Sequence, residues 1–106
     1  MFAVAIGMML AAAAAADDNG ARTEFSGCVR SSIARAITAK VDPAAFGDFA
    51  RQTCAAETTS FRNALIAYDV KAGWTRRKAE PDADQQIGDY LSEAGDKFKD
   101  AQTAAK

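Results

Sequence analysis

The fold is decided by residues 28–54, CVRSSIARAITAKVDPAAFGDFARQTC, which begin and end with the two cysteines of the chain. Asp42 and Pro43 are a strong signal for the start of a helix, because an Asp side chain accepts unpaired amide hydrogens and a proline at the first helical position loses no hydrogen bond. A bend there lies almost midway between Cys28 and Cys54. Two antiparallel helices joined by that bend would hold the cysteines opposite each other. We therefore predict an antiparallel helical hairpin that is linked by a Cys28–Cys54 disulfide.

Helical periodicity extends this hairpin on both sides. The first helix is predicted over residues 24–41, with Thr23 as its N-cap, and the second runs from Asp42 to Gly73, a residue suited to a left-handed C-cap. The side of the first helix that packs inward is made of Phe25, Val29, Ser32, Ile33, Ala36 and Lys40. The corresponding side of the second helix is made of Phe46, Phe49, Ala50, Cys54, Phe61, Leu65 and Tyr68.

A third helix is predicted to start near Pro81, because proline disfavours helix at the residue before it and the acidic residues that follow suit a helix N-terminus. Its apolar stripe is made of Ala83, Ile87, Tyr90, Leu91, Ala94 and Phe98. The sequence shows no strand pattern and no internal repeat. It therefore predicts an all-α fold, with a three-helix domain over residues 24–100 and a frayed end over residues 101–106.

Residues 1–16 contain no charged or polar side chain, and they end in an alanine run that is followed by Asp17. This segment is too short to span a bilayer core of about 30 Å comfortably, and Ala14 to Ala16 supplies the small residues that signal peptidase reads. We expect a signal peptide that is cleaved after Ala16, a flexible linker over residues 17–23, and no membrane span in the mature protein. An uncleaved anchor stays open because no Lys or Arg precedes the apolar segment, and so does an N-terminal helix packed into the domain.

Export to the periplasm or the exterior favours the disulfide, because cysteines in even number in an exported protein are usually bonded. Two alternatives compete with it. The cysteines are free buried thiols in one of them. In the other, residues 25–28 (FSGC) act as a lipobox and Cys28 carries a lipid anchor, although charged residues separate this motif from the apolar segment.

Composition and charge disfavour several functions. Thirteen basic and fourteen acidic side chains give a net charge of −1, so no nucleic-acid partner is expected. The chain has no His, which removes the commonest general base and transition-metal ligand. Asp82, Asp84 and Asp89 lack the alternating spacing and the glycine turn of a calcium loop. We therefore expect no enzymatic activity, no metal and no cofactor.

Glu57 is the acidic residue that periodicity places on the apolar face of the second helix. A buried carboxylate needs a cation or a proton, and Lys97 lies opposite Glu57 if the third helix folds back about residue 77. The functional interpretation is a perturbed acid or a ligand contact in a cleft near the disulfide. The alternative is a structural ion pair, or a side chain that reaches solvent at the rim of the bundle.

Trp74, Arg76, Arg77 and Lys78 form the dense aromatic and basic cluster of the chain. Such a cluster is suited to phosphate, to lipid headgroups or to an acidic partner. The alternative is that Trp74 closes the end of the second helix and that the cations are only solvated.

These features predict a small exported protein that is a non-enzymatic binding or interaction module, with a protein or an envelope component as its partner. One alternative is a structural or stress-related envelope protein without a dedicated site. Another is a small-ligand binder or enzyme that uses a cleft around Glu57. An exposed apolar patch would favour the first hypothesis, a uniformly polar exterior the second, and an occluded pocket at Glu57 the third.

Overall fold

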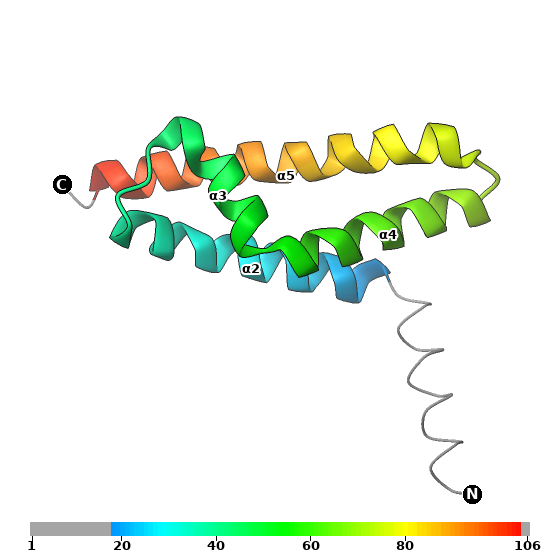
Figure 1. Cartoon of the computed structure of the whole chain (residues 1–106), viewed down its shortest axis with the longest axis horizontal. Coiled ribbons are helices and arrows are strands. Elements are labelled where there is room, and N and C mark those ends of the chain that lie inside the picture. The colour runs from blue at the N-terminus through cyan, green and yellow to red at the C-terminus, as the bar shows by residue number, and fades with distance from the viewer. Residues whose placement is uncertain (1–17, 105–106) are drawn as a thin grey trace, which may run out of the picture.

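A computed structural model describes residues 18–104 of the chain, and in this part every regular element is helical (Figure 1). The order of elements is α2 (Asp18–Thr38), the short 3₁₀ helix η1 (Pro43–Ala45), α3 (Phe46–Thr53), α4 (Ala55–Lys71) and α5 (Arg76–Ala104). The predicted all-α fold and the predicted Cys28–Cys54 disulfide are both confirmed. The predicted signal peptide lies outside the described residues.

Helix α2 begins at Asp18, so residues 18–23, which we expected to form a flexible linker, are helical. The reason is a set of contacts that this first part of the helix makes with the rest of the domain. Arg22 Nη1 donates a hydrogen bond of 3.0 Å to the Tyr90 hydroxyl, and the Arg22 guanidinium carbon lies 5.1 Å from the centre of the Phe61 ring. These long-range contacts outweigh the helix start that Thr23 offers locally.

The turn after α2 is closed by local hydrogen bonds. Lys40 adopts the left-handed conformation, with φ of 55°, and the Val41 amide donates to the carbonyl of Ala36 at 3.0 Å. Lys40 is therefore exposed at the end of the helix and does not join the inward side. Asp42 Oδ1 accepts a hydrogen bond of 2.8 Å from the Ala44 amide, which confirms the predicted helix start, here as the cap of η1.

The second predicted helix is broken at Cys54, and this corrects the expectation of one continuous helix from Asp42 to Gly73. The backbone at Cys54 has φ of −111° and ψ of 36°, outside the helical region, and α3 and α4 meet there at an angle (Figure 1). Thr58 Oγ1 donates to the carbonyl of Cys54 at 2.7 Å, so the oxygen at the break keeps a partner. The described domain therefore contains η1 and four α-helices where three helices were predicted.

Helix α5 begins at Arg76, five residues before the predicted start, and Pro81 lies inside it. The helix tolerates this proline in its second turn at the loss of one backbone hydrogen bond. An earlier start is available because Thr75 Oγ1 accepts a hydrogen bond of 3.3 Å from the Lys78 amide. At the other end, α5 continues to Ala104, so residues 101–104, which we expected to fray, are helical.

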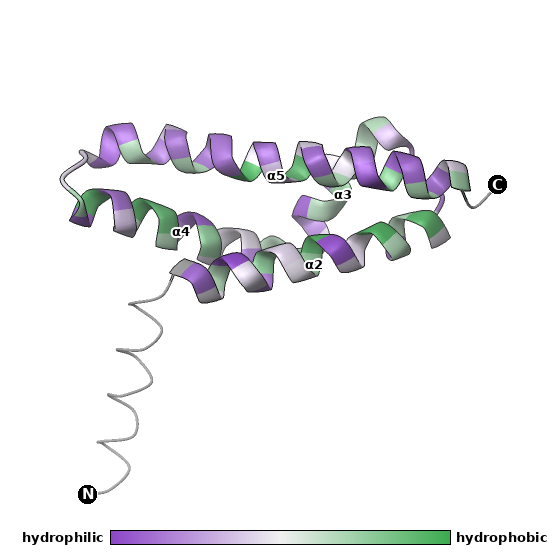
Figure 2. Ribbon diagram, turned by 180° about the vertical axis from the view of Figure 1, so that it is seen from behind, coloured by the Kyte–Doolittle hydropathy of each residue, from purple (hydrophilic) through white to green (hydrophobic). Residues whose placement is uncertain are grey.

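The core lies between α2, α4 and α5, with α3 packed across one end. It contains two aromatic groups. Phe25, Phe61 and Tyr90 have ring centres 5.1 to 5.8 Å apart, and further along the domain the Phe46 and Phe98 rings stack at 5.0 Å. Figure 2 shows hydrophilic residues along most of α5, so only a narrow stripe of this helix enters the core. That stripe is made of Ala79, Ala83, Ile87, Leu91, Ala94 and Phe98.

Candidate functional site

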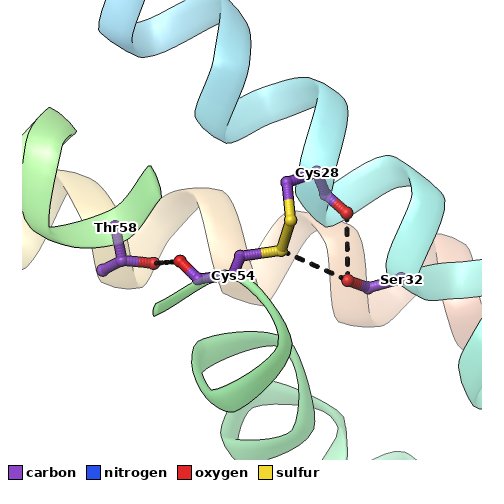
Figure 3. The surroundings of a disulfide bond; sticks show 4 residues. All are labelled: Cys28, Ser32, Cys54 and Thr58. Atoms are coloured by element: carbon purple, nitrogen blue, oxygen red, sulfur yellow. Dashed lines mark hydrogen bonds between the residues drawn. A yellow bond between two sulfur atoms is a disulfide. The ribbon is translucent and has the colours of Figure 1, made fainter. Parts of the chain in front are cut away.

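The disulfide joins the middle of α2 to the junction of α3 and α4, and Figure 3 shows its surroundings. Cys54 is fully buried, and the two Cα atoms are 5.9 Å apart. Ser32 is also fully buried, and its hydroxyl donates to the carbonyl of Cys28 at 2.9 Å and lies 3.3 Å from Cys54 Sγ. Every polar atom in this group therefore has a partner, as a structural cross-link requires.

A hollow of about 440 Å³ opens to solvent beside the disulfide. Its wall contains Glu57, Glu24, Arg35 and Cys28. The Glu57 side chain is half-buried there. Glu57 is therefore a residue of an open rim and not a carboxylate enclosed in an apolar core. The hollow has no occluded interior in which a small ligand would lose most of its hydration.

The predicted pairing of Glu57 with Lys97 is not formed. The Lys97 ammonium lies 3.7 Å from Glu93 on the surface of α5, and the Lys97 side chain is 68% exposed. The physical reason is the early start of α5, which moves the centre of the α4–α5 turn from residue 77 to about residue 74. The Arg62–Asp84 hydrogen bond between α4 and α5 agrees with a centre near residue 74, which places Glu57 level with a part of α5 that precedes Lys97.

The acidic residues near the start of α5 make contacts within the domain. Asp84 Oδ1 accepts a hydrogen bond of 2.7 Å from Arg62 Nε, which links α4 to α5 and holds the pKa of Asp84 below its ordinary value. Gln86 Nε2 donates to Asp82 Oδ2 at 3.0 Å, and Asp89 is exposed. Within residues 18–104, no group of three or more acidic or thiol side chains is placed to hold a metal ion.

The predicted cluster of Trp74, Arg76, Arg77 and Lys78 is brought together at the turn between α4 and α5. Gly73 has φ of 107° and acts as the left-handed C-cap of α4, as predicted. The Lys78 ammonium lies 4.7 Å from the centre of the Trp74 ring, within the range of a cation–π interaction. Arg76 pairs with Glu80 at 3.1 Å along α5, and Arg77 is exposed.

The structure adds three residues of α4 to this cluster that the sequence did not assign to it. Tyr68 is 63% exposed and Val70 43%, and with Trp74 at 38% they are the large hydrophobic residues that are exposed in the described part of the chain. Lys71 is exposed between them. Tyr68 was expected on the inward side of the second helix. This expectation was wrong because α4 extends beyond the first turn of α2 in this region (Figure 1). We call residues 68–78 the tip.

Asp69 is the single acidic residue of the tip. Its Oδ2 atom is buried and has no hydrogen-bond partner among the described residues. Burial raises the pKa of Asp69, and the negative charge of Asp82 on α5 raises it further.

None of the helices in residues 18–104 is long and apolar enough to cross a membrane. Comparisons with known proteins yield no match, whether with family models, with curated proteins or with solved structures. The chemistry of the tip and of the hollow is therefore the basis for assigning a function.

Proposed function

We propose that the mature chain is an exported, non-enzymatic binding protein that contacts its partner through the tip. In this proposal, residues 1–16 are a signal peptide, and the protein acts in the periplasm or the exterior, where a disulfide persists. The Cys28–Cys54 bond serves to hold α2 against α3 and α4 as an antiparallel hairpin, which leaves the α4–α5 turn free to project.

The observation that carries the proposal is the coincidence of exposed apolar side chains with exposed cations. Tyr68, Val70 and Trp74 lie within seven consecutive residues, and the tip also contains four of the thirteen basic residues of the chain. Exposing large apolar side chains leaves hydrophobic stabilisation unused, about 25 cal/mol for each Å² that stays in water. Exposed apolar groups that gather in one place, with Trp, Tyr and Arg among them, are typical of binding surfaces.

The two alternative functions have weaker support. A structural or stress-related envelope protein without a dedicated site needs no aromatic residues in solvent, and a polar tip would serve it equally well. A small-ligand binder or enzyme at Glu57 needs an enclosed site, whereas the hollow at Glu57 is open.

The proposal is tested by sedimentation with the washed envelope fraction of the exporting cell. We expect the purified protein to pellet with the envelope, and the double variant Tyr68→Ser/Trp74→Ser to lose at least nine-tenths of that binding. The matched control is Glu57→Gln, which alters the hollow and leaves the tip intact, and it should bind like the unmodified protein. Equal binding of the tip variant and the unmodified protein would contradict the proposal, and loss of binding in Glu57→Gln alone would favour the hollow.

Export is tested separately by mass spectrometry of the intact protein from the cell. We expect a species that lacks the first sixteen residues and that gains two hydrogens on reduction. A species that retains residues 1–16, or one with two free thiols in the exported fraction, would contradict this part of the proposal.

A further inference from the structure

We propose that the partner of the tip is the surface of an anionic phospholipid bilayer. This inference rests on the proposed function and specifies the chemistry of the partner. It follows from the shape of the tip, from the residue types that the tip exposes, and from the separation of positive charge on this chain.

The tip is a projecting end and not a groove. Figure 1 shows the α4–α5 turn extending beyond the first turn of α2, so among residues 18–104 only α4 and α5 form this end of the domain. The hollow beside the disulfide and a second, smaller one between α2 and α5 are both lined by residues outside the tip. A projecting end of eleven residues can rest on a plane, as the surface of a bilayer requires.

The apolar residues of the tip are those that favour the boundary between lipid and water. Trp74 and Tyr68 each combine an aromatic ring with a polar N–H or O–H group, and such residues are enriched at the headgroup level of membranes. Val70 adds aliphatic surface next to them. Figure 2 shows hydrophobic residues continuing along α4 to its last turn, which lies beyond the first turn of α2.

The charge of the tip complements an anionic surface. Lys71, Arg76, Arg77 and Lys78 are all exposed, while the only acid in residues 68–78 is Asp69, whose Oδ2 atom is buried. The whole chain has a net charge of −1, so positive charge is concentrated at the tip and the rest of the protein is acidic. An anionic membrane would therefore attract the tip and repel the remainder, which orients the protein with its α4–α5 turn toward the lipid.

Nucleic acid fits these observations less well, because its binding proteins have a basic excess over a whole face or domain. An acidic protein fits the charge but not the projecting shape.

Trp74 makes the inference directly testable, because it is the single tryptophan of the chain. The protein, purified from the exporting cell with its disulfide intact, is titrated with vesicles of phosphatidylcholine alone and with vesicles that contain 30 mol% phosphatidylglycerol. We expect the Trp74 emission to shift to shorter wavelength, and to be quenched by brominated lipid, only with the anionic vesicles. Binding should weaken strongly in 0.5 M salt.

The tip variant Arg76→Gln/Arg77→Gln/Lys78→Gln tests the role of charge. Each cation close to an anionic surface strengthens binding about fivefold, so removing three should weaken it by roughly 100-fold. Trp74 is retained in this variant and reports binding in the same way. Circular dichroism with thermal melting shows whether the variant is folded, and Lys71→Gln, which lies outside the α5 capping region, provides a second variant with an expected loss of about fivefold.

The matched control removes three exposed cations elsewhere, in Arg30→Gln/Arg51→Gln/Lys99→Gln. Its net charge equals that of the tip variant, and all proteins share the same N-terminus, so any contribution of residues 1–16 is constant. We expect the control to lose less than about fivefold. Equal losses in the tip variant and the control, or equal binding to neutral and anionic vesicles, would overturn the inference.

The closing comparison separates this inference from the proposed function. If the envelope pellets the protein through Tyr68 and Trp74 but anionic vesicles do not bind it, the tip is a binding site and its partner is not lipid. If envelope treated with protease loses its binding, the partner is a protein and the lipid inference is wrong. If neither envelope nor vesicles bind through the tip, both proposals fail.

Discussion

Reduction of the Cys28–Cys54 bond is expected to lower the free energy of unfolding by about 3.5 kcal/mol at 25 °C. The cysteines are 26 residues apart in the sequence, and the chain-entropy relation for a closed loop of this length gives that magnitude. A domain of this size is stable by about 4 to 13 kcal/mol in total. Reduction should therefore remove a large share of the stability without changing a single residue.

The surroundings of the bond indicate that the entropic term is the main one. Cys54 is fully buried, and after reduction its thiol stays next to the Ser32 hydroxyl, 3.3 Å away, which can pair with it. The Ser32 hydroxyl also keeps its hydrogen bond to the carbonyl of Cys28. Reduction thus leaves no buried polar group without a partner, and the native packing needs little change.

The assay is urea unfolding followed by circular dichroism at 222 nm, with oxidised and reduced protein in parallel and the thiols counted by mass. With a urea slope of about 1 kcal/mol per M, the midpoint should fall by roughly 3 M. The slope itself should rise on reduction, because the unfolded chain without its loop exposes more surface. A decrease in stability of less than about 1 kcal/mol, with both thiols shown to be free, would refute the reasoning.

Three further perturbations test the core and the charges. Phe98→Ala removes a fully buried ring and should lower the free energy of unfolding by about 3 to 5 kcal/mol in the same urea assay. Asp69→Asn should raise the melting temperature at pH 7, because burial raises the pKa of Asp69 and the folded protein is less stable with this carboxyl charged. The gain should shrink as the pH falls and the native carboxyl takes up a proton, and the control Asp89→Asn, at an exposed position, should show no gain. Asp84→Asn should lower the melting temperature at pH 7 and have no effect in acid, because the pKa of Asp84 is lowered by Arg62 and its contribution is lost as the pH falls through that pKa; a loss that is independent of pH would contradict this.

The parts of the fold that could be predicted from sequence are those fixed by local chemistry. The Asp42 cap depends on residues within one turn of it, and the left-handed Gly73 needs only the freedom of a glycine backbone. The disulfide followed from the symmetric placement of Cys28 and Cys54 about that cap. Each of these inferences needed no knowledge of how distant segments pack.

Most of the errors concern interactions between distant segments, and one concerns a local cap. The break at Cys54 has no glycine or proline to announce it, and it arises where α3 turns across α5 to stack the Phe46 and Phe98 rings. Pro81 was predicted to start a helix because proline disfavours helix at the residue before it and acidic residues follow it, whereas Thr75 provides a cap that starts the helix earlier. The earlier start changes which residues of α5 lie level with a given residue of α4.

The candidate site was predictable in part for the same reason. Trp74 and the three cations after it lie within five consecutive residues, so their closeness in the sequence revealed the cluster. Tyr68 was missed because helical periodicity projects it onto the apolar side of α4. Its exposure depends on where the first turn of α2 lies relative to α4. The strongest signal available was Tyr68 itself, an aromatic residue three residues before Lys71 and six before Trp74.

The exposure of the tip has a consequence for why these residues are present at all. The part of α4 and α5 that extends beyond the first turn of α2 packs as a pair of helices. Small buried residues such as Ala79 and Ala83 fill the contact between the two helices. Tyr68 and Val70 lie outside that contact, so the fold gains little from their apolar surface and serine or lysine would serve as well at these positions. Both side chains are exposed beside Trp74 and four cations, and the fold needs neither of them for packing. Their apolar surface therefore stays in water in the isolated chain, as is typical of a binding surface. The disulfide lies at the opposite end of α4, at its N-cap Cys54, and secures the packing of α2 against the core without constraining the tip. In the function proposed above, stability and recognition depend on opposite ends of one helix.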